Sequence, residues 1–157
     1  MSEVPTTCDI LEQPVEQGYD ALLAFCARFA ASCSLVVRSG GMSMSQQGYS
    51  FLALCAPHLI EAAARSEWPG TALLGHTATV YRYRLSPGML DCLKAGSRRL
   101  YGWLQPTLPE DLAIYRPDDS VLLASIAHES DAWLKLHEPE IIDAHRLPLR
   151  LAMRSRE

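Results

Sequence analysis

The sequence lacks the features that mark exported, membrane-bound and disulfide-stabilised proteins. Its first residues, MSEVPTTCDILEQP, carry acidic side chains where a secretory signal would have basic residues followed by an apolar run. No uninterrupted apolar segment approaches the ~18 residues that a membrane helix needs. The five cysteines are odd in number and never form a C-x-x-C pair, which argues against a disulfide framework or a zinc site. We therefore expect a cytoplasmic protein with buried free thiols and no association with membranes.

Catalytic and cofactor motifs are missing as well. No glycine-rich turn follows a strand to hold a nucleotide phosphate, and neither G-x-S-x-G nor H-E-x-x-H occurs. His58 and Glu61 have the spacing of two ligands on one helix face, but no second histidine completes a metal site beside them. The sequence therefore predicts no cofactor and no metal.

The charge of the chain is unevenly distributed along its length. The net charge is −4, with five acidic residues and no Lys or Arg in residues 1–27, and four arginines against one glutamate in residues 144–157. Nucleic-acid binding depends on clustered basic side chains, because much of the affinity comes from counterion release at phosphates. We therefore do not expect this chain to bind nucleic acid, and only its arginine-rich end departs from that expectation.

Length and composition predict one folded domain. The chain has 157 residues, of which 48% are apolar and 20% charged, as in proteins with a substantial core. We expect a single globular domain over residues 1–157, with frayed ends at 1–13 and 154–157. Apolar residues recur at helical spacing over 14–31, from Phe51 to Ala63, and over 87–104. Pro57 must kink or restart the second of these three predicted helices.

Strand patterns alternate with these helices. Residues 34–38 form a β-branched run, residues 76–85 alternate with period two, and residues 112–116 and 120–127 are apolar runs joined by Pro117-Asp118-Asp119. Residues 131–137 fit a short helix or a final turn, and Leu147–Met153 resembles an edge strand. These elements predict an α+β fold, a two-layer sandwich with about three helices on a mostly antiparallel sheet of four to five strands.

The most compact polar cluster follows a predicted strand and contains His128, Glu129 and Asp131. A histidine beside a carboxylate can be oriented as a general base. Adjacent strand residues point to opposite faces, however, so His128 and Glu129 converge only if the strand has already ended. One hypothesis is a small enzyme that uses His128 with Glu129 or Asp131, and the other is a structural histidine at the rim of an apolar strand.

Two acidic segments, Pro109-Glu110-Asp111 and Pro117-Asp118-Asp119, bracket the predicted strand 112–116. They are either ordinary solvated turns or, with Trp68 or Trp103 nearby, contact points for a basic partner. The binding hypothesis assigns no catalytic residue. Its candidate contact residues are Trp68, Glu110, Asp111, Asp118, Asp119, His128, Glu129 and Asp131.

The segment WLQPTLPEDLAIYRPDDSVLLASIAHESDAWL, residues 103–134, resembles the C-terminal half of small bacterial immunity proteins, which neutralise contact-dependent or secreted toxins. The resemblance implies a cytoplasmic, non-enzymatic inhibitor that occludes the active site of a toxin, and it assigns no individual binding residue. Another protein is therefore the expected partner. Two alternatives stay open, the small enzyme and a structural or regulatory subunit that forms a homodimer through the edge strand Leu147–Met153.

Overall fold

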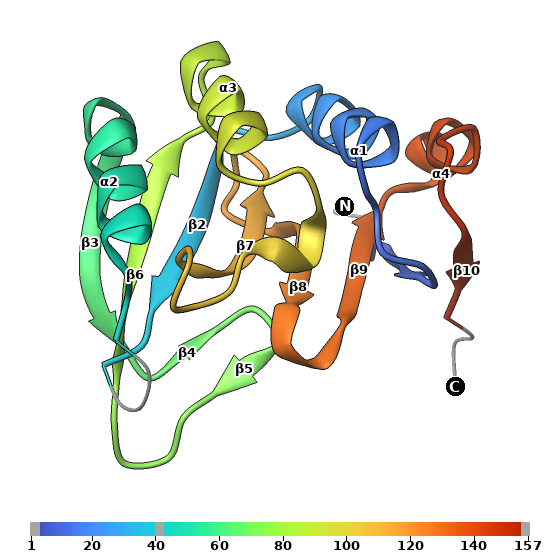
Figure 1. Cartoon of the computed structure of the whole chain (residues 1–157). Coiled ribbons are helices and arrows are strands. Elements are labelled where there is room, and N and C mark those ends of the chain that lie inside the picture. The colour runs from blue at the N-terminus through green and yellow to red at the C-terminus, as the bar shows by residue number, and fades with distance from the viewer. Residues whose placement is uncertain (1–3, 40–42, 155–157) are drawn as a thin grey trace.

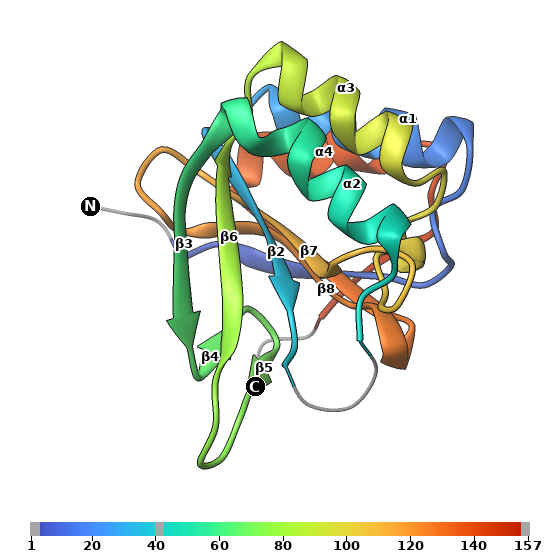
Figure 2. The ribbon, with the colours of Figure 1, turned by 60° about the vertical axis from the view of Figure 1, so that its left-hand side comes forward.

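The computed structural model describes residues 4–39 and 43–154. Within them, four helices cover one face of an eight-stranded sheet (Figures 1 and 2). The helices are α1 (Gln17–Ala27), α2 (Gln46–Cys55), α3 (Pro87–Gly96) and α4 (Glu138–His145), with short 3-10 turns η1 (Ala56–His58), η2 (Leu100–Gly102) and η3 (Ala127–Glu129). The strands are β1 (Thr6–Ile10), β2 (Ser32–Val37), β3 (Leu59–Arg65), β6 (Ala78–Arg84), β7 (Glu110–Tyr115), β8 (Val121–Ile126), β9 (Asp131–Leu136) and β10 (Leu151–Met153), and a separate hairpin contains β4 (Glu67–Trp68) and β5 (Thr71–Ala72).

Every neighbouring pair of strands in the large sheet is antiparallel, and the order is β10-β1-β9-β8-β7-β2-β6-β3. The first strand, β1, lies between the last two, so that Cys8 pairs with Leu134 on one side and with Met153 on the other. The expected α+β class is confirmed. The expected numbers of about three helices and four to five strands were too low.

The main core fills the space between the helices and the sheet. Large side chains of α1, α3 and the segment after α3 meet here, and they include Leu22, Leu93 and Trp103. Burying a side chain of this size contributes about 1.5–3 kcal/mol. Two aromatic side chains of the core have their polar atoms paired, because the Tyr19 hydroxyl donates to the Leu93 carbonyl at 2.9 Å and accepts from Trp103 Nε1 at 3.1 Å.

Local sequence signals explain where α2 and α3 begin. Ser86 Oγ accepts a hydrogen bond from the Met89 amide at 3.1 Å, and Pro87 occupies the first turn, where a missing amide proton costs nothing. Ser45 Oγ accepts in the same way from the Gly48 amide at 3.4 Å. The expected start of the third helix at residue 87 is confirmed, but α3 ends at Gly96, well before residue 104. No helix in the described segments has the length and apolarity needed to cross a membrane.

The largest error concerns the predicted helix from Phe51 to Ala63. Its first part forms α2, but after Pro57 the chain becomes β3, which pairs with β6 from Leu59 onward. Alanines favour helices in isolation, and here the open edge of β6 supplies pairing partners that outweigh that preference. The proline ends α2 instead of restarting it.

The two ends of the chain are more ordered than predicted. Residues 131–137 were expected to form a helix or a turn, but they form β9, whose alternate residues are buried, and α4 follows with Pro139 in its first turn. The expected frayed lead-in 1–13 contains β1, and Arg154 forms an ion pair with Asp9. Residues 1–3 and 155–157, the remainder of the expected frayed ends, lie outside the described residues.

Candidate functional site

Three of the predicted contact residues, Trp68, Glu110 and Asp111, lie in the interior. The structure brings them together with two further residues in what we call the Arg38 cluster, namely Arg38, Trp68, Gln105, Glu110 and Asp111. Glu110 and Asp111 belong to β7 rather than to a solvated turn, and Asp111 is only 1% exposed. All three predicted residues are therefore turned toward the protein and not toward a partner.

Asp111 is the centre of this cluster. It has a φ of 57°, where the pairing of β7 with β2 shifts by one residue, which is the geometry of a β-bulge. Its carboxylate accepts a hydrogen bond from Trp68 Nε1 at 3.0 Å and another from the Ala127 amide at 3.0 Å. Nη2 of Arg38 lies 3.7 Å from the same carboxylate. One side chain thus links β4, η3 and the end of β2 to β7.

Glu110 completes the charge balance of the Arg38 cluster. Its carboxylate accepts from Arg38 Nε at 2.8 Å and from the Gln105 amide at 3.4 Å. The Arg38 guanidinium also lies over the Trp68 ring, 5.1 Å from its centre, as in a cation–π contact. Buried carboxylates that are paired in this way support the scaffold, because their charges are already compensated.

The β4–β5 hairpin packs on the face of the large sheet that is turned away from the helices, which we call the open face. Trp68 contributes to a second, smaller apolar cluster there with Val36 and Ala78. The turn of the hairpin contains Gly70, whose φ is 89°. An added Cβ at Gly70 would lie 2.8 Å from the ring of Trp133 on β9, so the hairpin lies directly on the sheet.

Replacing Gly70 with alanine should destabilise the protein by about 1–3 kcal/mol, because alanine disfavours positive φ and the new methyl group would clash with Trp133. Thermal unfolding of the variant would measure the loss. Gly75 is the matched control, since its φ is also positive, at 77°, but nothing lies within 4 Å of an added Cβ. Equal losses at the two positions would mean that the hairpin is not packed against the sheet.

The second predicted acidic segment is exposed at the turn between β7 and β8. Asp118 accepts from the Ser120 hydroxyl and amide, and these hydrogen bonds lower the pKa of its carboxyl. Asp119 accepts from Arg82 Nη2 at 2.7 Å, and the Arg82 guanidinium stacks on Tyr115 with 3.7 Å to the ring centre. Beside this arginine lies a cavity of about 400 Å³, lined by Ala31, Ser32, Ile60, Glu61, Arg82, Arg84 and Asp119.

The remaining predicted residues, His128, Glu129 and Asp131, are exposed at the opposite end of β8. His128 Nε2 lies 3.7 Å from Glu129 Oε1, which is beyond a hydrogen bond, and no hydrogen bond or ion pair joins Asp131 to either residue in the described part of the chain. A six-residue strand spans roughly 20 Å, so this group and Asp118-Asp119 cannot act on one small substrate. The cavity beside Arg82 is not lined by His128, Glu129 or Asp131.

The cysteines do not have the environment of catalytic thiols. All five are buried and free. Burial raises the pKa of Cys33 to about 12, and it raises the pKa of Cys8, Cys26 and Cys55 as well. Because the thiolate is the reactive form, burial disfavours reaction of these four thiols at neutral pH. In the described segments, no three His, Cys, Asp or Glu side chains are arranged to hold a metal ion.

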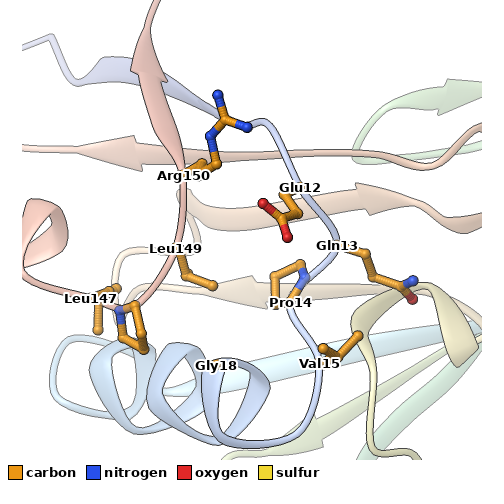
Figure 3. A pocket seen from close by; sticks show the side chains of 9 residues that line it. Glu12, Gln13, Pro14, Val15, Gly18, Leu147, Leu149 and Arg150 are labelled. Atoms are coloured by element: carbon orange, nitrogen blue, oxygen red, sulfur yellow. The ribbon is translucent and has the colours of Figure 1, made fainter.

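Sequence reasoning missed a groove between two segments that are far apart in the chain (Figure 3). We define the groove by its lining residues, 12–15 and Gly18 on one side and 147–150 on the other, and its volume is about 380 Å³. Figure 3 shows Leu149 facing Pro14 across it, with Glu12 and Arg150 near one end. Pro14, Val15, Leu147, Pro148 and Leu149 make its walls apolar, and Glu12, Gln13 and Arg150 provide polar groups.

The groove is held in place by backbone pairing behind it. The Glu16 amide donates to the Arg98 carbonyl at 2.8 Å, and the Leu100 amide donates to the Pro14 carbonyl at 3.0 Å. The Arg98 side chain adds a two-pronged ion pair with Asp20. Glu16 has a φ of 50°, which is unusual for a residue with a side chain, at the point where the chain enters α1. One wall of the groove is therefore fixed by its contacts with the rest of the fold.

The groove has a mixed lining, with apolar side chains on both walls and polar groups beside them. Its walls carry neither a thiol, a hydroxyl nor an imidazole, and Val15 remains 47% exposed although the adjacent Pro14 is buried. The tail segment was predicted to be an edge strand from Leu147, but only Leu151–Met153 pair with β1, and residues 147–150 lie outside this strand and line the groove. No protein-family model, curated protein or solved structure matches this chain.

Proposed function

We propose that this protein is a non-enzymatic binding protein that inhibits another protein, and that the groove receives an apolar side chain of that partner. The observation that carries this proposal is the composition of the groove, apolar walls with Glu12 and Arg150 at one end. Protein interfaces have the same arrangement of an apolar centre and a polar rim. Binding energy concentrates where a large side chain enters such a pocket.

The specific role that we propose is that of a cytoplasmic immunity protein, which neutralises a cognate toxin by covering its active site. The resemblance of residues 103–134 to bacterial immunity proteins supports this role. The exposed carboxylates at the two ends of β8, among them Asp118, Glu129 and Asp131, support a basic partner, because surface charge accelerates encounter with an oppositely charged protein.

The alternative of a small enzyme has less support. It needs His128 to converge with Glu129 or Asp131 in a pocket, whereas His128 and Glu129 are half exposed and 3.7 Å apart. The buried carboxylates Glu110 and Asp111 are engaged by Arg38, Trp68 and backbone amides. In this arrangement, none of these four carboxylates is better placed to act as a general base than an ordinary surface carboxylate.

The function can be tested with the protein encoded by the adjacent gene. We expect that protein to arrest bacterial growth when it is produced alone, and we expect co-production of this chain to restore growth. The two proteins should also co-purify in a defined ratio. If the neighbouring product is harmless, or if it remains toxic in the presence of this chain, the immunity role is contradicted.

The groove can be tested within that complex. Replacing Val15 with aspartate places a charge in the groove and should weaken binding roughly 30-fold, the equivalent of about 2 kcal/mol at an interface centre. Leu74→Asp is the matched control, because Leu74 is 92% exposed and lies outside the groove. Titration calorimetry would compare the two variants with the natural protein. Unchanged affinity in the properly folded Val15→Asp variant would place the partner elsewhere.

A further inference from the structure

The strand β3 ends the large sheet, and no strand among residues 4–39 and 43–154 pairs with its outer side. It pairs with β6 along one edge and is the last strand in the sheet order. Figures 1 and 2 show it at the border of the molecule, with no labelled element beyond it. The opposite border is formed by β10, which has three residues against the seven of β3. The longer free edge therefore belongs to β3.

The composition of β3 leaves this edge open to pairing. Natural edge strands are usually short, or are protected by proline, charged side chains or a bulge, because free backbone groups attract another strand. The sequence of β3, LIEAAAR, contains no proline or lysine, its two charged residues have opposite signs, and its register shift lies at its first residues. Its first two residues are exposed apolar side chains, Leu59 at 40% and Ile60 at 56%, and three small alanines follow. Small side chains allow a second strand to approach closely.

We propose that the partner of this edge is a second copy of the same chain, paired antiparallel about Ala63, so that two eight-stranded sheets become one continuous sheet. The argument rests on the charges of β3. After a register shift between Leu59 and Glu61, the strand is regular from Glu61 to Arg65, and Ala63 is its midpoint. Antiparallel pairing about Ala63 places Glu61 of each copy directly opposite Arg65 of the other.

The two neighbouring two-fold registers are less favourable. Pairing about Ala64 would place Glu61 opposite Glu67 of the second copy, and like charges directly opposite each other are destabilising. Pairing about Ala62 would place Leu59 opposite Arg65 and Glu61 opposite Ala63 of the second copy, so that no charged pair forms across the interface. Within one chain, Glu61 and Arg65 already lie 2.9 Å apart on the same side of the strand, so both are placed to exchange partners across the new interface.

The pairing has a further geometric result. Ile60 and Glu61 of β3 also line the cavity beside Arg82. Joining two sheets at β3 keeps their open faces on one side, so the two cavities would lie on the same surface, on either side of the two-fold axis. The groove lies next to β1 and β10, at the other end of the sheet order, and each copy would therefore carry its groove away from the dimer interface.

The dimer can be tested by measuring mass in solution with charge-reversed variants of the full chain. Sedimentation equilibrium of the natural protein should give twice 17.4 kDa at high concentration. Glu61→Arg and Arg65→Glu should each weaken dimerisation roughly tenfold to hundredfold, because each change turns two attractive cross-strand pairs into repulsive ones. The double variant with both changes exchanges the charges and should restore the dimer.

Both side chains are exposed, so the fold should survive each reversal, and melting temperatures within a few degrees of the natural protein would show that it does. A natural protein that remains monomeric at every concentration overturns the proposal. A dimer that is indifferent to Glu61→Arg also overturns it and favours the β10 edge. The proposal does not depend on the groove, since Val15→Asp should leave the mass unchanged while Glu61→Arg should leave partner binding intact.

Discussion

Replacing Asp111 with alanine should lower the free energy of unfolding by about 3–5 kcal/mol, a large part of the stability of an ordinary domain. The change removes the acceptor for Trp68 Nε1 and for the Ala127 amide, and a buried donor without a partner costs about 1–3 kcal/mol. It also leaves the Arg38 guanidinium with one carboxylate instead of two. Alanine at a φ of 57° adds backbone strain to these losses.

A second substitution at the same position separates the causes. Asp111→Asn keeps one oxygen acceptor and a side chain that tolerates positive φ, so it should cost less than Asp111→Ala. Chemical denaturation would measure both losses, and tryptophan fluorescence would report the release of Trp68. Asp91→Ala, a change at an exposed acidic residue of α3, is the control and should be nearly neutral. If Asp111→Ala were also neutral, Asp111 would not be the link between β4, η3 and β7.

The second large effect is expected at the ion pair between Arg116 and Glu140. Both side chains are only 9% exposed, and the two guanidinium nitrogens of Arg116 donate to the Glu140 carboxylate at 2.8 and 2.6 Å. Glu140 also accepts from the His137 amide at 2.8 Å. Glu140→Ala should cost about 3–5 kcal/mol, because it leaves a buried guanidinium uncompensated.

The matched variant removes both charges. Replacing Arg116 and Glu140 together with leucine should cost less than Glu140→Ala alone, because no buried charge is then left without a partner. Denaturant unfolding of the single and double variants would measure the difference. A double variant that loses at least as much stability as Glu140→Ala would show that the hydrogen bonds to backbone groups, and not the charge pair, dominate here.

The same pair predicts how stability depends on pH. Burial of Glu140 opposes its ionisation, but the Arg116 hydrogen bonds, the His137 amide and the arginine charge outweigh it, so the pKa is held below its ordinary value of 4.5. A lowered pKa stabilises the folded state above the unfolded pKa, and that stability is lost as the pH falls through the folded pKa. The melting temperature should therefore fall below about pH 5 more steeply in the natural protein than in Glu140→Gln.

Much of the fold follows from short-range patterns. The alternation in residues 76–85 predicted β6, the Ser86-Pro87 pair predicted the start of α3, and the turn at 117–119 predicted the β7–β8 hairpin. Each of these features depends on neighbours within a few residues, which a single sequence records directly. Elements of this kind were found within a few residues of their true bounds.

The missed features depend on residues that are distant in the sequence. Residues 59–65 form a strand only because β6 offers a pairing edge. A run of alanines in the sequence does not indicate that such an edge is nearby. The acidic residues at 110–111 looked like a solvated turn, because their compensating partner, Arg38, is at the end of another strand. The groove needs segments 12–15 and 147–150 to meet, and neither segment alone shows a binding pattern.

The position of β1 also determines when the protein can finish folding during synthesis. Cys8 leaves the ribosome early, but its two pairing residues, Leu134 and Met153, are made near the other end of the described chain. Until then the strands from β2 to β8 can pair with one another, while β1 has no neighbour and the β9 side of the sheet stays open. Contacts between such distant residues slow folding and leave strand edges unprotected meanwhile. A nascent chain halted before residue 131 should therefore be protease-sensitive at residues 4–16 although β2, β6 and β7 have already been synthesised.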